Sequence, residues 1–219
     1  MCFSAPASFV ASAGIAVIGI ATIRQAKTRP QYILAGIPII FSIQQLAEGF
    51  LWLRLSNAGY EYLQNIPMYL FLVVAQVIWP TYVPYAILAY EKDAKRKKII
   101  GILLGLGLLT SGYFLYCLLF YPVQASIGNH HIVYDLHFPL SNKWYSGATY
   151  MLATVLASLL SGMKRLRYFG LLLLVSYLIA SFLYKEYLIS VWCYFSAVLS
   201  VYTLYIVRKD NQSRQHNQQ

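Results

Sequence analysis

Seven long apolar stretches dominate this sequence of 219 residues, and they constrain its fold more than any other feature. They cover residues 5–23, 32–53, 66–90, 100–121, 144–161, 168–184 and 187–207. A helix needs about 20 mostly apolar residues to cross the roughly 30 Å hydrocarbon core of a bilayer. Only 11% of the residues are charged, whereas soluble domains carry roughly 25%. The sequence therefore predicts an all-α membrane protein, with residues 1–207 forming a single domain of seven transmembrane helices.

Basic residues at the ends of these stretches predict the orientation of the chain. Fourteen of the 17 Lys and Arg residues lie after the first, third, fifth and seventh stretches, and therefore on one side of the membrane. The other three lie after the even-numbered stretches, on the opposite side, and are Arg54, Lys143 and Lys185. Cytoplasmic loops carry an excess of basic residues, so we expect the N-terminus outside and the C-terminus in the cytoplasm. We expect no cleavable leader, which together with this orientation favours the inner membrane of a bacterium. The polar residues 208–219 are predicted to be a disordered cytoplasmic tail.

The formal net charge of +10 does not indicate nucleic-acid binding, because the basic residues are divided among four short segments. The expected partner of these cations is the lipid bilayer, since a basic residue near an anionic membrane surface contributes about 1 kcal/mol. A homo-oligomer or another membrane protein as partner is left open, and no cofactor is assigned.

Polar residues of the second and third stretches gather toward the predicted outer face. Gln44, Glu48 and Trp52 are spaced by four residues and therefore share one face of a helix. An acidic residue inside a membrane helix is costly and usually faces the interior of the bundle. These features predict a polar, ligand-binding pocket lined by Gln44, Gln45, Glu48, Trp52, Gln76 and Trp79.

Three cysteines also fall on the predicted outer side, and they are weaker candidates for a thiol site. They are Cys2, Cys117 and Cys193. A buried cysteine most often fills space as a small apolar side chain, and that interpretation is favoured for each of them.

The one long outer loop, residues 122–143, predicts a short β-hairpin between the fourth and fifth helices. Gly128 and Asn129 are typical turn residues, and residues 131–138 alternate between polar and apolar side chains. We expect the apolar side to cover the bundle. Imidazole and carboxylate groups bind divalent metals, but a solvated strand face is the favoured interpretation of the polar side, whose residues are His131, Asp135 and His137.

Two strings in the first quarter of the chain carry a resemblance to a known family. The chain starts Met1-Cys-Phe-Ser-Ala5, and residues 44–52 read Gln-Gln-Leu-Ala-Glu-Gly-Phe-Leu-Trp. In these strings the sequence resembles a family of uncharacterised bacterial multi-pass membrane proteins, a domain of unknown function whose members begin with the same Met-Cys-Phe-Ser-Ala. The resemblance implies a bacterial source but no reaction.

Three functions remain open at this point. The favoured one is binding of a small molecule or lipid at the outer polar pocket, in sensing or transport. The second is an intramembrane enzyme acting on a lipid or a lipid-linked substrate, which is less favoured because no predicted span contains a histidine. The third is a structural or assembly role in a membrane complex, with Glu48 serving only as a contact between helices.

Overall fold

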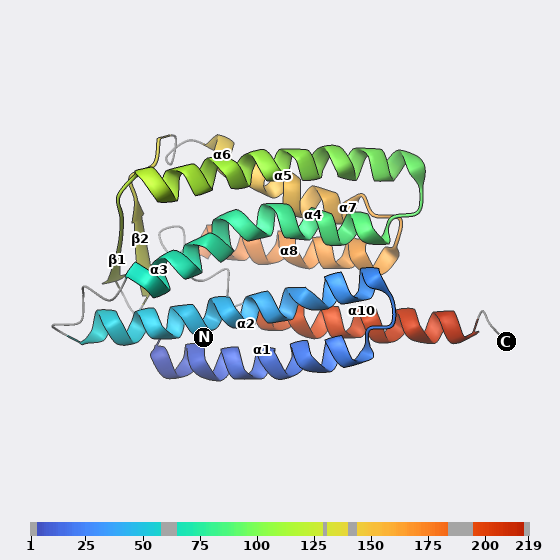
Figure 1. Cartoon of the computed structure of the whole chain (residues 1–219), viewed down its shortest axis with the longest axis horizontal. Coiled ribbons are helices and arrows are strands. Elements are labelled where there is room, and N and C mark those ends of the chain that lie inside the picture. The colour runs from blue at the N-terminus through green and yellow to red at the C-terminus, as the bar shows by residue number, and fades with distance from the viewer. Residues whose placement is uncertain (1–3, 58–64, 129–130, 140–143, 184–194, 217–219) are drawn as a thin grey trace.

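The computed structural model describes residues 4–57, 65–128, 131–139, 144–183 and 195–216 as a bundle of long helices with two short strands at one end (Figure 1). The helices in the first half of the chain are α1 (Ala5–Gln25), α2 (Arg29–Ser56), α3 (Asn65–Leu72), the π-helix η2 (Val73–Ile78), α4 (Trp79–Tyr90) and α5 (Ala94–Phe120). The elements of the second half are β1 (Val123–Gly128), β2 (His131–Leu136), α6 (Trp144–Met151), the π-helix η3 (Leu152–Leu156), α7 (Ala157–Leu159), α8 (Lys164–Leu183) and α10 (Ser196–His216).

Five helical segments of the described chain are long and apolar enough to cross a membrane. They are Ala5–Gln25, Arg29–Ser56, Asn65–Tyr90, Ala94–Phe120 and Lys164–Phe182. Gly147–Leu159 is apolar but shorter, and residues 187–194 of the last predicted span lie outside the described residues. The predicted helical membrane fold with one small hairpin is thus confirmed at the level of its elements.

The helices α1 and α2 pack against each other through small and hydroxyl side chains. Ser12 Oγ donates a hydrogen bond to the carbonyl oxygen of Ser42 over 2.9 Å, and Ser42 Oγ donates to that of Ser12 over 3.0 Å. The backbone of Gly49 lies against the ring of Phe9, so that a side chain at this position would overlap the ring. Small residues allow such close approach between membrane helices.

The third predicted span is interrupted by the π-helix η2, and its path bends between α3 and α4 (Figure 1). Pro80 has no N–H group, so a carbonyl oxygen in the preceding turn loses its helical partner. The carbonyl oxygen of Ala75 instead accepts a hydrogen bond from Tyr150 Oη at 2.8 Å, and that of Val77 accepts one from Ser111 Oγ at 2.6 Å. Side chains of neighbouring helices therefore satisfy the backbone where the regular helix is broken.

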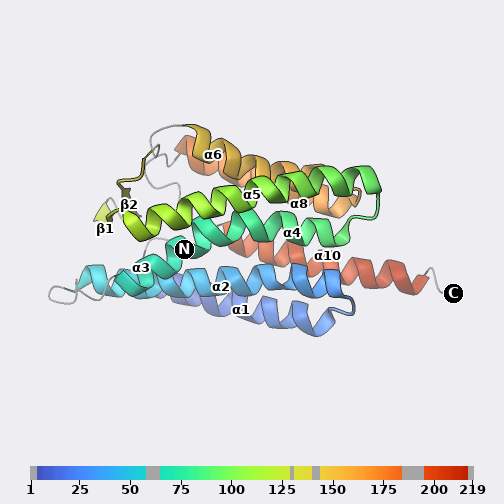
Figure 2. The ribbon, with the colours of Figure 1, turned by 45° about the horizontal axis from the view of Figure 1, so that its top comes forward.

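The C-terminal tail differs from the prediction of disorder, because α10 continues to His216 and projects beyond the other helices (Figures 1 and 2). Polar contacts support the helix where apolar packing ends. Arg214 Nε lies 3.1 Å from Asp210 Oδ2, one turn earlier, and Ser213 Oγ donates to the carbonyl oxygen of Lys209. Pairs at this spacing stabilise a helix in water.

Candidate functional site

The candidate residues of α2 all face the interior of the bundle. Gln44, Gln45 and Trp52 are buried, and Glu48 is 0% exposed. The carboxyl group of Glu48 is therefore enclosed by protein rather than turned toward lipid, as expected for an acidic residue in a membrane helix.

A hydrogen bond joins the polar face of α2 to α4. The indole Nε1–H of Trp79 donates to Gln44 Oε1 over 2.8 Å. The ring of Trp79 also lies against that of Phe41, with 4.2 Å between the ring centroids. Two of the candidate residues, from helices that are separated in sequence, are thus brought into direct contact.

Gln76 lies in η2, one turn before Trp79, and is buried. The chain direction of α2 is opposite to that of the segment from α3 to α4 (Figure 1). Gln44 and Trp79 are in contact and therefore lie at one level of the bundle. Glu48 lies one turn after Gln44, and Gln76 lies one turn before Trp79. Because the two segments run in opposite directions, Glu48 and Gln76 also lie at one level. Among the residues that the structure describes, Gln76 Oε1 has no hydrogen-bond donor.

Trp52 lies one turn further along α2 and carries a second buried polar atom of this kind. Its side chain is 5% exposed, and its Nε1–H has no acceptor in the described part of the chain. Buried polar atoms are hydrogen-bonded in the great majority of cases. An acceptor on Gln76 and a donor on Trp52 therefore both remain available beneath the hairpin end of the bundle.

The β-hairpin covers this end of the bundle with apolar side chains, as predicted. Its strands pair antiparallel, from Val123 opposite Leu136 to Gly128 opposite His131. The ring of Tyr134 stacks on that of Phe71 in α3, with the centroids 5.0 Å apart. The apolar cluster that includes Trp52 extends into the hairpin through Val123, Ala125, Ile132 and Phe138.

The polar residues of the hairpin do not share one exposed face. Asp135 and His137 are exposed, and His137 Nε2 lies 3.8 Å from Asp135 Oδ2. His131, expected on the same side, is instead buried at the turn end of β2. No group of three His, Cys, Asp or Glu side chains suited to a metal ion occurs among the described residues.

The three cysteines are not brought together within the described chain. Cys117 is a buried free thiol in α5 that packs in the same apolar cluster as Trp52. Cys2 and Cys193 lie outside the described residues. The role of Cys117 as an apolar space-filling side chain agrees with its surroundings.

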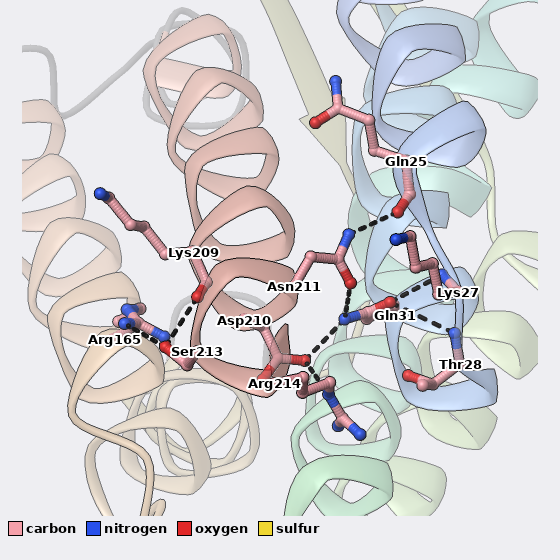
Figure 3. A network of polar contacts seen from close by, with 10 residues as sticks. All are labelled: Gln25, Lys27, Thr28, Gln31, Arg165, Lys209, Asp210, Asn211, Ser213 and Arg214. Carbon is pink, nitrogen blue, oxygen red and sulfur yellow. Dashed lines mark hydrogen bonds and ion pairs between the residues drawn. The ribbon is translucent and has the colours of Figure 1, made fainter. Parts of the chain in front are cut away.

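A second polar network, at the opposite end of the bundle, was not predicted from the sequence (Figure 3). Gln31, at the start of α2, is completely buried. Its Oε1 accepts hydrogen bonds from the backbone N–H groups of Lys27 and Thr28, at 2.7 and 3.2 Å. Its Nε2 donates to Asp210 Oδ2 at 2.7 Å and to Asn211 Oδ1 at 2.9 Å. The network ties α10 to the turn between α1 and α2. Its sequence signal is a glutamine three residues after a threonine, a common pattern at helix starts.

At the same end, Glu91 connects two further turns. Glu91 Oε2 accepts a hydrogen bond from the backbone N–H of Gly162 at 2.7 Å, and Oε1 accepts from those of Lys92 and Asp93 at 3.0 and 3.1 Å. Burial by itself would raise the pKa of Glu91. The three backbone donors and the nearby charge of Arg96 outweigh burial and hold the pKa below its usual range. Glu91 is therefore ionised, and its hydrogen bonds connect the turn before α5 to the turn before α8.

The chain belongs to a protein family whose model matches residues 1–218 and is described as "Family of unknown function (DUF6629)". The match extends the resemblance seen in the first two predicted spans to nearly the whole sequence. No curated protein and no solved structure shows a significant match to the chain.

Proposed function

We propose that this chain crosses a bacterial inner membrane seven times, with its N-terminus outside, and that the buried polar groups beneath the hairpin bind a small molecule or a lipid from the outer side. The turns α1–α2, α4–α5 and α7–α8 and the end of α10 lie at one end of the bundle, opposite the hairpin (Figure 1). Fourteen of the 17 basic residues belong to these turns and their flanking helix ends. Excess basic charge favours the cytoplasmic side, which supports an outer position for the hairpin.

The observation that carries the binding proposal is the pair of buried polar atoms without partners in the described chain, Gln76 Oε1 and Trp52 Nε1. Leaving such an atom unpaired costs about 1–3 kcal/mol. A ligand that donates to the amide oxygen and accepts from the indole would recover this free energy. The buried carboxyl of Glu48 at the level of Gln76 adds a charge-bearing group to the same region.

The proposal is tested by comparing Gln76→Leu with Gln44→Leu in protein purified in mild detergent without added ligand. Replacing Gln76 removes an unpaired buried acceptor, so thermal stability should stay unchanged or rise. Replacing Gln44 removes the acceptor of the Trp79 indole, so stability should fall by about 1–3 kcal/mol. Equal destabilisation by both variants would mean that Gln76 serves only as a structural contact.

Access from outside is tested by labelling a cysteine at position 76 in a chain whose native cysteines have been replaced. A small, membrane-impermeant methanethiosulfonate reagent added to whole cells should modify Gln76→Cys. The control is Val83→Cys, two turns along the same segment and buried in the apolar core, which should remain unmodified. Equal rates at the two positions would contradict a polar site that opens outward.

A further inference from the structure

We propose that the end of the bundle opposite the hairpin holds the headgroups of anionic phospholipids on a surface formed by the first turns of α5 and α8. We call it the basic surface, and it is made of the exposed residues Lys95, Arg96, Lys97, Lys98, Lys164 and Arg167. Neither first turn contains an acidic residue.

The hydrogen bonds of Glu91 connect the turns that precede the two parts of the basic surface, one on α5 and one on α8. Glu91 closes the turn before α5, and its hydrogen bond to the backbone of Gly162 reaches the turn before α8. Arg96 Nη1 would lie 2.9 Å from a Cβ atom added to Gly162. The first turn of α5 therefore lies beside the residues that lead into α8.

Glu91 and Asp93, the acidic residues next to the basic surface, offset only part of its charge, because they bring two carboxylates against six cations. Glu91 accepts three backbone hydrogen bonds, as described above. Asp93 Oδ1 accepts from the backbone N–H of Arg96 at 2.9 Å and so caps α5. Asp210 is bound by Gln31 and Arg214. Cations at a helix N-terminus also oppose the helix dipole, so an external anion would relieve the repulsion between them.

Apolar side chains next to the basic surface point to a lipid as the source of that anion. Ile99 and Ile102 on α5, and Tyr168 and Leu171 on α8, are all exposed one or two turns beyond the cations. A ligand that matches a charged surface followed by an apolar one carries negative charge at one end and hydrocarbon at the other. Phosphatidylglycerol has this chemistry, whereas a free anion would leave the apolar part uncovered.

The experiment uses the full chain reconstituted in phosphatidylcholine vesicles with trace spin-labelled phosphatidylglycerol or phosphatidylcholine. Electron spin resonance gives the association constant of each lipid with the protein, and the wild type should prefer phosphatidylglycerol severalfold. One basic residue near an anionic lipid changes that preference up to about fivefold. The preference should fall severalfold in the triple variant K95Q/K98Q/K164Q, which removes three of the six cations of the basic surface.

The matched control removes the same charge from the same end of the bundle but from other helices, in the triple variant R24Q/K27Q/K209Q. It should retain most of the preference. Equal loss in both variants would overturn the assignment to α5 and α8, because the preference would then reflect the total charge of this end. A wild type without preference would overturn lipid binding itself. Replacing chloride with inorganic phosphate at equal ionic strength should leave the lipid preference in place, and its loss would identify a free-phosphate site instead.

Discussion

A close approach between α4 and α5 predicts a large difference between two glycine substitutions on the same helix. A Cβ atom at Gly107 would lie 2.9 Å from the carbonyl carbon of Pro80 and closer still to its oxygen. Carbon atoms in favourable contact are about 3.5–4.0 Å apart, and the obstacle is backbone, which has no rotamer to change. A Cβ atom at Gly105, two residues earlier, would meet nothing within 4 Å.

Gly107→Ala should therefore destabilise the protein by about 3 kcal/mol, at the upper end of typical overpacking costs. Gly105→Ala should be neutral or stabilise by up to about 1 kcal/mol, because alanine is the better helix former. For a chain of this size, 3 kcal/mol corresponds to a fall in Tm of roughly 6–12 °C. Thermal unfolding of both variants in the same detergent, followed by circular dichroism, measures the difference. Equal Tm values would refute the reasoning that the contact with Pro80 requires glycine.

Three further predictions concern polar contacts. Glu91→Gln should cost about 1.5–3 kcal/mol at neutral pH. Because the folded-state pKa of Glu91 lies below the ordinary value of 4.5, this stabilisation is present above pH 4.5 and is lost as the pH falls through the lower folded-state value. The Tm difference from wild type should therefore shrink in acid. A difference that stays constant would contradict the claim that the ionised carboxylate of Glu91 stabilises the fold. In a double-mutant cycle, Ser12→Ala and Ser42→Ala should show a coupling of about 0.6–1 kcal/mol, whereas additive effects would disprove the reciprocal pair. Gln31→Leu should release the last turns of α10 and raise amide exchange around Asp210 about tenfold, and unchanged exchange would show that Gln31 does not hold them.

Hydropathy predicts the membrane helices well, because burial in lipid and burial in the bundle both require apolar side chains. It does not detect where a helix continues past the apolar region. The stretch predicted at 100–121 begins six residues late, since α5 starts at Ala94 with Asp93 as its cap. The same limitation explains α10, whose polar last turns are supported by Gln31 and by contacts within the helix.

The candidate site was predictable in part. A spacing of four residues correctly places Gln44, Glu48 and Trp52 on one buried face of α2. The predicted pocket also grouped Trp79 with this face, but the individual hydrogen bond from Trp79 to Gln44 was not predictable, because it depends on how α2 and α4 meet. His131 is a similar case: the alternation of polar and apolar residues predicts that its side chain is exposed, but in the structure it is buried.

The prolines account for the irregular backbone around Gln76. Pro84 has no N–H group to bond the carbonyl oxygen of Pro80, and that oxygen is the atom that Gly107 approaches. Pro80 in turn leaves one carbonyl oxygen of the preceding turn without its helical partner, and in that turn the carbonyl oxygen of Ala75 accepts a hydrogen bond from Tyr150. Gln76 lies inside this irregular turn, where the buried stretch runs through three consecutive residues, 74–76. π-Helical segments are frequently found at functional sites. Gly107 and Tyr150, from α5 and α6, thus contact the same irregular segment in which Gln76 is buried.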